Sequence, residues 1–228
     1  TPPAILTVTP APAAVTNGLV VYLNFDNNIQ GQAGTTVHGT AIGNVGQEKY
    51  TTGVVGSAAA QFDNEPINEP IVTDWAISLG DIEWLYAGSF SFALWVKTTD
   101  TYGTLLGNKS WLSGTNVGWC ISQYRNPNWL NYRAEGVLRR DIGNSPWADD
   151  QWHHVAAVFH REGNRVFTYV DGNLTAHHSI GNTGYEGLTP TDIMTTLVGS
   201  SGDTHDSSFG SVDDLGMWAR PLGEAEVL

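Results

Sequence analysis

The sequence predicts an all-β protein, an antiparallel two-sheet β-sandwich of the jelly-roll type. From Gly18 onward, short apolar and β-branched runs alternate with clusters of Gly, Asn, Asp and Ser. No long segment has the 3.6-residue period of an amphipathic helix. A chain of 228 residues, 41% of them hydrophobic, is long enough to bury one full core between two sheets.

The expected strands can be read in chain order. The first is GLVVYLNF (18–25), and SFSFALWVKT (89–98) alternates so that one face carries Phe90, Phe92, Leu94 and Val96. Further strands are expected over 118–124, 129–135, 137–142, 152–160, 165–172, 195–200 and 213–219. Asp171-Gly172 predicts a hairpin turn. PLGEAEVL (221–228) predicts one short helical turn.

The chain divides into two parts. Residues 1–17 hold four of the ten prolines and no charge, which is typical of a semi-rigid linker. Residues 18–228 form the predicted sandwich domain. Because the chain starts without Met and stops within a helical pattern, we expect a module cut from a longer protein.

Composition excludes several classes of protein. A net charge of −13 argues against a nucleic-acid binder, and no apolar run is long enough to span a membrane. One cysteine, Cys120, excludes an intrachain disulfide and a cysteine-based zinc site. Nine tryptophans exceed what core packing alone usually needs.

Several segments together carry a family likeness: QWHHVAAVF (151–159), RVFTYVDGNL (165–174), SVDDLGMWARPLGEAEV (211–227) and NGLVVYLNFDNN (17–28) with GSAAAQFDN (56–64). In this order they resemble the bacterial branch of the laminin G-like, concanavalin A-like jelly-roll superfamily. LLGNKSWLSGTNVGW (105–119) resembles accessory modules of secreted hydrolases. The resemblance implies the fold more strongly than the function.

The sequence predicts no catalysis. Jelly-roll glycosidases need two carboxylates facing the scissile bond, commonly as Glu-x-Asp-x-(x)-Glu on one strand, and that pattern is absent from the sequence. His153 and His154 are adjacent on a strand, so they point to opposite faces and cannot chelate together. The motifs of serine hydrolases, P-loops and zinc proteases are also absent.

A structural calcium ion is the one cofactor expected. Asp26 ends the first strand, Asp213 and Asp214 begin the last long one, and terminal strands lie side by side in a jelly roll. The resemblance implies calcium in this region and favours Asp26 and Asp213 as ligands, with Asn28 nearby. The alternative is that Asp26 caps a turn and Asp213 accepts backbone hydrogen bonds.

The segment 108–140 is the predicted ligand face. It holds five of the ten basic residues, interleaved with aromatic and Asn side chains. Aromatic rings stack on sugar faces, Asn bonds hydroxyl groups, and Arg grips carboxylate or sulfate. The predicted contacts are Trp111, Asn116, Tyr124, Arg125, Asn128, Trp129, Arg133 and Arg139. Three other tryptophans follow strand patterns and are assigned to packing: Trp95, Trp152 and Trp218.

These observations predict a non-catalytic carbohydrate-binding module of a larger secreted or cell-surface bacterial protein. Its ligand would be a polysaccharide or oligosaccharide, with acidic and sulfated glycans among the candidates. A covalently linked catalytic domain would be its partner. One alternative is a laminin G-like adhesion, spacer or protein-interaction domain without a glycan ligand, and the other is a catalytic domain with an unfamiliar site.

Overall fold

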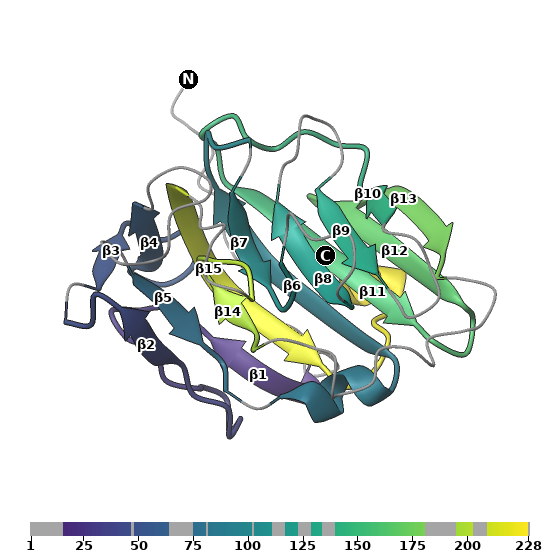
Figure 1. The fold of residues 1–228 in the computed structure, drawn as a ribbon, viewed down its shortest axis with the longest axis horizontal. Coiled ribbons are helices and arrows are strands. Elements are labelled where there is room, and N and C mark those ends of the chain that lie inside the picture. The colour runs from purple at the N-terminus through teal and green to yellow at the C-terminus, as the bar shows by residue number, and fades with distance from the viewer. Residues whose placement is uncertain are drawn as a thin grey trace.

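Two antiparallel β-sheets stack face to face in the computed structural model (Figure 1), as the sequence predicted. The structure describes residues 16–46, 48–63, 75–80, 82–101, 103–110, 117–122, 129–133, 140–180, 195–202 and 209–227. Residues 1–15 of the predicted linker lie outside these ranges. In the described part the helical elements are two 3-10 helices, η2 (Glu83–Ala87) and η4 (Glu224–Glu226), and none is long and apolar enough to cross a membrane.

The larger sheet, sheet A, has the strand order β13-β12-β11-β6-β15-β4-β3, and β1 also pairs with β15. The strands are β13 (Asn173–Ser179), β12 (Arg165–Val170), β11 (His153–His160), β6 (Phe90–Lys97), β15 (Phe209–Trp218), β4 (Ala59–Asp63), β3 (Lys49–Thr51) and β1 (Leu19–Leu23). Asp171 and Gly172 have φ angles of 50° and 73°, so the predicted hairpin turn between β12 and β13 is confirmed.

The second sheet, sheet B, has the order β10-β9-β8-β7-β14-β5-β2. Its strands are β10 (Arg140–Ile142), β9 (Leu130–Arg133), β8 (Gly118–Ser122), β7 (Thr104–Gly107), β14 (Leu197–Val198), β5 (Trp75–Ser78) and β2 (Thr40–Gly43). The last three strands before β11 in the chain, β8, β9 and β10, form an antiparallel meander at one side of this sheet.

Aromatic rings fill the core between the sheets. Phe92 of β6 stacks on Trp119 of β8 with ring centroids 4.5 Å apart, and Phe90 stacks on Phe159 of β11 at the same distance. All four inward residues of β6 that the alternation predicts are fully buried. The inward alternation of β11 is likewise confirmed, because Val155, Ala157 and Phe159 belong to this core.

The C-terminal segment covers part of the outer face of sheet A. Leu222 and Val227 pack there against Ala93, Ala156 and Trp218. Arg220 holds the segment closed with two hydrogen bonds to the carboxylate of Glu226, at 2.7 and 2.8 Å. The part of this face around Lys97, the last residue of β6, and Ser211, near the start of β15, lies beyond this covering cluster.

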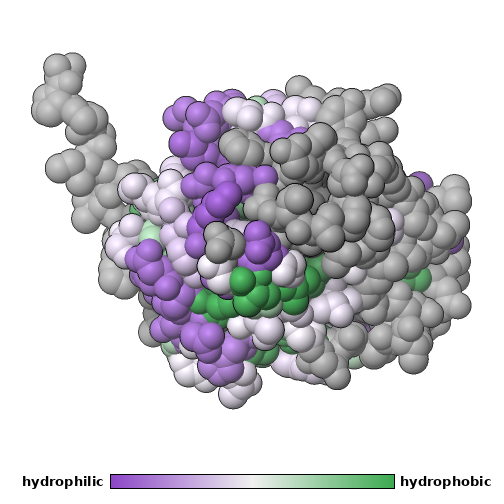
Figure 2. Space-filling model, turned by 60° about the vertical axis from the view of Figure 1, so that its left-hand side comes forward, coloured by the Kyte–Doolittle hydropathy of each residue, from purple (hydrophilic) through white to green (hydrophobic). Residues whose placement is uncertain are grey.

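Hydrophilic residues dominate the end of the sandwich near β2 and β3, with a band of hydrophobic residues among them (Figure 2). Across the described residues, the large hydrophobic side chains that are exposed are Val45, Trp84 and Leu174, on three separate elements or turns. Isolated apolar side chains of this kind are ordinary on a protein surface.

Replacing Glu226 tests the Arg220–Glu226 pair, which we call the C-terminal clasp. The hydrogen bonds from Arg220 lower the pKa of Glu226 to about 2, so the stabilisation exists above the ordinary glutamate pKa and is lost as the pH falls through about 2. We expect Glu226→Gln to lower the free energy of unfolding by about 0.5–1 kcal/mol at neutral pH, a small value because the pair is partly exposed. Urea titrations at pH 7 and pH 3 should show a smaller difference at the lower pH. Glu224→Gln, in the same turn, is the matched control; an equal loss there would refute the clasp.

Candidate functional site

The predicted ligand face is only partly described. Trp111, Asn116, Tyr124, Arg125, Asn128 and Arg139 lie outside the described residues. Trp129 and Arg133 are described. Arg133 ends β9 and is half-buried. The predictions for the six other residues therefore stay predictions.

Trp129 is a core residue, so its prediction as an exposed platform is wrong. Its side chain is 1% exposed. The backbone N–H of Trp129 donates to the Ile142 carbonyl at 2.9 Å, and its own carbonyl accepts from Ser122 at 2.8 Å, so the residue is held between strands. The indole lies where a Cβ on Gly143 would come within 2.3 Å of it. The glycine makes room for the ring.

Lys109 does not belong to a basic surface formed by segment 108–140. Lys109 is fully buried, and its ammonium group donates to the carbonyl of Ser110 at 2.5 Å. Arg140 is exposed on β10.

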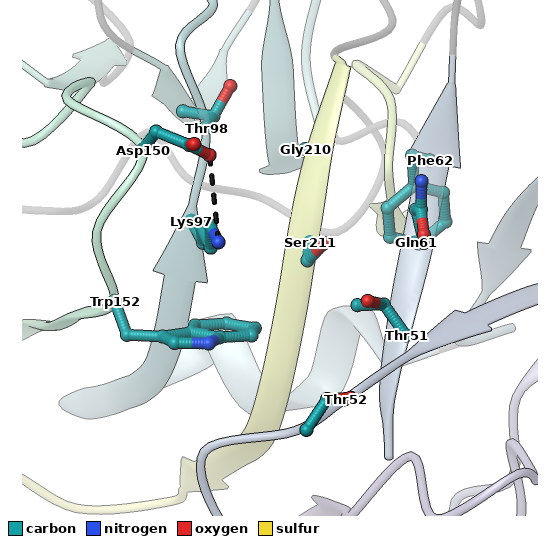
Figure 3. Close-up of a pocket in the computed structure, with 10 residues that line it drawn as sticks. All are labelled: Thr51, Thr52, Gln61, Phe62, Lys97, Thr98, Asp150, Trp152, Gly210 and Ser211. Carbon is teal, nitrogen blue, oxygen red and sulfur yellow. Dashed lines mark ion pairs between the residues drawn. The ribbon is translucent and has the colours of Figure 1, made fainter.

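A shallow pocket opens instead on the outer face of sheet A, and we call it the Trp152 pocket (Figure 3). It has a volume of about 170 Å³. Its lining comes from β3, β4, β6, β15 and the turn before β11: Thr51, Thr52, Gln61, Phe62, Lys97, Thr98, Asp150, Trp152, Gly210 and Ser211.

Strand register places the polar floor of the pocket. Ser211 of β15 pairs with Gln61 of β4 on one side and with Lys97 of β6 on the other. Neighbouring strands lie about 4.8 Å apart, so these three side chains form a row across the sheet. Lys97 follows the inward residue Val96, and this alternation turns the lysine away from the core.

Trp152 forms one wall of the pocket, so its assignment to the core is wrong. The indole is half-buried and extends across the sheet toward β15 in Figure 3. Trp152 immediately precedes β11, which begins at His153, so the strand alternation does not fix the direction of its side chain. Trp218 is buried at 6% exposure, whereas Trp95 is half-buried and meets His154 edge-on at 5.3 Å.

The turn that carries Asp150 and Trp152 is anchored at several points. The N–H of Asp150 donates to the Thr98 carbonyl at 3.0 Å. His153 lies between two carboxylates, with Nδ1 2.8 Å from Asp171 and Nε2 3.2 Å from Asp149. Asp171 also accepts the backbone N–H of His154 at 2.9 Å. These contacts tie the wall of the pocket to the β12–β13 hairpin.

The pocket offers hydrogen-bonding groups of both kinds. The ammonium nitrogen of Lys97 lies 3.7 Å from a carboxylate oxygen of Asp150, and both side chains reach solvent. The amide nitrogen of Gln61 donates to Asp63 at 2.8 Å, which leaves the Gln61 carbonyl oxygen as an acceptor. Thr51, Thr52 and Ser211 add hydroxyl groups.

The predicted calcium residues meet around one loop. As expected, β1 pairs with β15. Asp26 accepts the N–H groups of Ser57 and Ala58 at 2.5 and 3.0 Å. Asp213 is fully buried and accepts two more N–H groups, those of Val54 and Val55, at 2.9 and 3.0 Å. These contacts match the alternative to a calcium site, in which Asp26 caps a turn and Asp213 accepts backbone hydrogen bonds.

The same oxygens have the chemistry that calcium prefers. Burial raises the pKa of Asp213 to about 6, whereas the hydrogen bonds from Ser57 lower the pKa of Asp26. One oxygen of each carboxylate accepts a single hydrogen bond, from Asn24 to Asp26 and from Asp214 to Asp213, so lone pairs remain. Asn28 uses its side chain within its own turn. Among the residues described, no three His, Cys, Asp or Glu side chains are grouped to hold a metal.

The fold and this surface define a concanavalin A-like β-sandwich. Residues 73–228 match the Laminin_G_3 family, described as the concanavalin A-like lectin/glucanases superfamily, and the chain belongs to that family. The resemblance inferred from the sequence is thereby confirmed.

Relatives and solved structures extend the comparison. Human Pentraxin-4 is 27% identical over 148 residues, 61% of this chain and 30% of that protein. Domain 4 of AbnA, a GH43 extracellular arabinanase from Geobacillus stearothermophilus solved with arabinotriose, is 22% identical with a TM-score of 0.67, covering 92% of this chain and 96% of that one. The binding domain of Paraclostridial Mosquitocidal Protein 1 is 16% identical with a TM-score of 0.66, covering 92% and 51%. The chain spans less than a third of Pentraxin-4, and these structural likenesses show the fold.

Removing His153 tests the anchor of the pocket wall. Burial alone would lower the pKa of His153, but the hydrogen bonds and charges of Asp171 and Asp149 raise it. The stabilisation is therefore complete below the ordinary histidine pKa and is lost as the pH rises through the higher folded value. We expect His153→Ala to cost about 0.2–1 kcal/mol more at pH 5.5 than at pH 9, by thermal unfolding. The exposed His178→Ala is the control. A pH-independent loss would contradict this reading.

Proposed function

We propose that the protein is a non-catalytic carbohydrate-binding module and that the Trp152 pocket is its ligand site. The observation that supports this most directly is a half-buried indole standing beside a charged donor–acceptor pair and a row of polar side chains. An indole face packs against the apolar C–H face of a sugar ring. The lysine, carboxylate, amide and hydroxyl groups match the hydroxyl groups around the ring edge.

The pocket favours binding over hydrolysis. Glycoside hydrolysis uses two carboxyl groups that flank the scissile bond. Asp150 is the one carboxylate among the described residues that line the pocket. The pocket is also smaller than the clefts of about 300–1,000 Å³ that enclose drug-sized ligands, so we expect modest affinity for a single site.

The biological setting is part of the proposal. The arabinanase domain that shares this fold belongs to an extracellular enzyme and was solved with an oligosaccharide. By analogy, we place this module in a secreted or cell-surface bacterial protein, joined to a glycan-active catalytic domain. Tethering would raise the effective concentration of that domain at the polysaccharide.

Two other readings give different outcomes in the same experiment. The predicted contacts outside the described residues, Trp111 foremost, could form a second binding surface. An adhesion, spacer or protein-interaction role is the other alternative, and it predicts that no polysaccharide binds. Binding lost with Trp111→Ala but kept with Trp152→Ala would favour the segment 108–140 over the pocket.

Affinity electrophoresis against a panel of polysaccharides tests the function. We expect Trp152→Ala to weaken binding at least about tenfold, because stacking and its desolvation are lost together. Trp84→Ala is the matched control, since Trp84 is 52% exposed and lies in η2, which precedes Phe90 at the opposite end of β6 from Lys97. Folding of each variant is checked by circular dichroism. If no polysaccharide retards the folded wild-type protein, the proposed function is wrong.

Calcium is proposed as a structural ion held by Asp26 and Asp213, with Asn28 nearby. Such an ion would cross-link β1, β15 and the loop 53–58, and it would play no part in a reaction. We expect calcium to raise the thermal unfolding midpoint relative to chelator, and Asp26→Asn to remove the calcium-dependent part of that rise. Equal midpoints with calcium and with chelator would refute the proposal and favour bonding to backbone alone.

A further inference from the structure

We propose that the Trp152 pocket selects uncharged sugars and discriminates against uronic and sulfated ones, with the Lys97–Asp150 pair as the selecting element. This inference rests on the proposed function, and it names the class of glycan that the pocket would take. It differs from the expectation drawn from segment 108–140, whose arginines made acidic and sulfated glycans candidate ligands.

The spacing of the pair suits a hydroxyl group. Lys97 and Asp150 are 3.7 Å apart, longer than the roughly 2.7–3.2 Å of a closed hydrogen bond. A sugar hydroxyl can accept from the ammonium group and donate to the carboxylate at once. Sulfate and ionised carboxylate groups only accept, so they could satisfy Lys97 but would face the negative charge of Asp150 without a proton to offer.

The backbone fixes the position from which the Asp150 carboxylate extends. Asp150 adopts a left-handed φ of 66°, and its N–H is bonded to the carbonyl of Thr98 on the neighbouring strand end. The turn therefore keeps the main chain of Asp150 beside the end of β6, within side-chain reach of Lys97. An arriving anion would have to displace the carboxylate or accept the repulsion.

The surrounding charges reinforce the discrimination. The charges of Lys97 and Asp150 cancel each other within the described lining of the pocket. On the neighbouring strand β3, Lys49 pairs with Gln61. The charges of Lys49 and Asp63 cancel in the same way, because the Lys49 ammonium nitrogen lies 2.7 Å from an Asp63 carboxylate oxygen. Beyond these pairs the whole chain carries a net charge of −13. No described part of the lining presents an excess of positive charge to attract an anion across the Debye length of about 8 Å.

Glycans of matched backbone and different charge test this inference. The panel pairs mannan with polymannuronate and neutral galactan with sulfated galactan, and adds arabinan as a further neutral polymer. We expect the wild-type protein to be retarded by neutral polymers, with a binding constant that changes less than about twofold between about 0.05 M and 0.5 M NaCl. Trp152→Ala should abolish that retardation.

The Asp150→Asn variant then isolates the selecting charge. We expect it to bind the neutral polymer about three- to tenfold more weakly, because a charge-assisted hydrogen bond is replaced by a neutral one. It should gain salt-sensitive binding of the anionic partner, since Lys97 is no longer neutralised. Lys97→Gln should weaken neutral binding without that gain. Glu224→Gln, which removes the same charge far from the pocket, is the control and should change neither.

The outcomes separate the two proposals. Trp152-dependent binding that prefers the uronic or sulfated polymer overturns the selectivity and leaves the proposed function standing. Neutral binding that survives Trp152→Ala overturns the assignment to this pocket. An absence of binding to every polymer by the folded protein overturns both.

Discussion

The structure depends on the pairing of β15 with three other strands. Along one edge β15 pairs with β6, while the opposite edge is shared by β4 near Phe209 and by β1 near Trp218. The register of β15 against β6 shifts between Asp213 and Gly216, where Asp214 adopts a left-handed φ of 46°. The junction is secured by carboxylates, because Asp213 holds the loop 53–58 and Asp214 accepts the hydroxyl of Tyr22 at 2.5 Å. One strand thereby joins the first part of the chain to the last.

The same strand divides the outer face of sheet A into zones. At its end Trp218 lies under the C-terminal segment, in its middle Asp213 lies under the loop 53–58, and at its start Ser211 is the floor of the Trp152 pocket. Two zones are closed by chain that folds back over the sheet. The third is the Trp152 pocket, where an indole and polar side chains from neighbouring elements reach solvent together.

The sequence predicted the sandwich because inward alternation and turn residues are local signals, and β6, β11 and the Asp171-Gly172 turn followed them. β13 could not be predicted in this way: it is an edge strand with both faces largely exposed, so no hydrophobic alternation marks it. The assignments of Trp129 and Trp152 were wrong for a related reason. Trp129 follows an Asn-rich loop but is held between two strands, and Trp152 precedes its strand. Whether an indole points inward at such a boundary depends on partners far away in sequence, such as Gly143.

The meeting of Gly18 and Ala219 determines how the sandwich would bear load. The N–H of Ala219 donates to the carbonyl of Gly18, and Arg220 reaches the carbonyl of Asn17, so β1 begins where β15 ends. Tension drawn between these two points would act across the hydrogen bonds of the pair and open them one after another, as a zipper opens. Tension entering at Ala219 alone would pass along β15 into the sheet, where many hydrogen bonds would resist in parallel. Attachment to another domain through a single terminus would therefore resist force better than attachment through both termini.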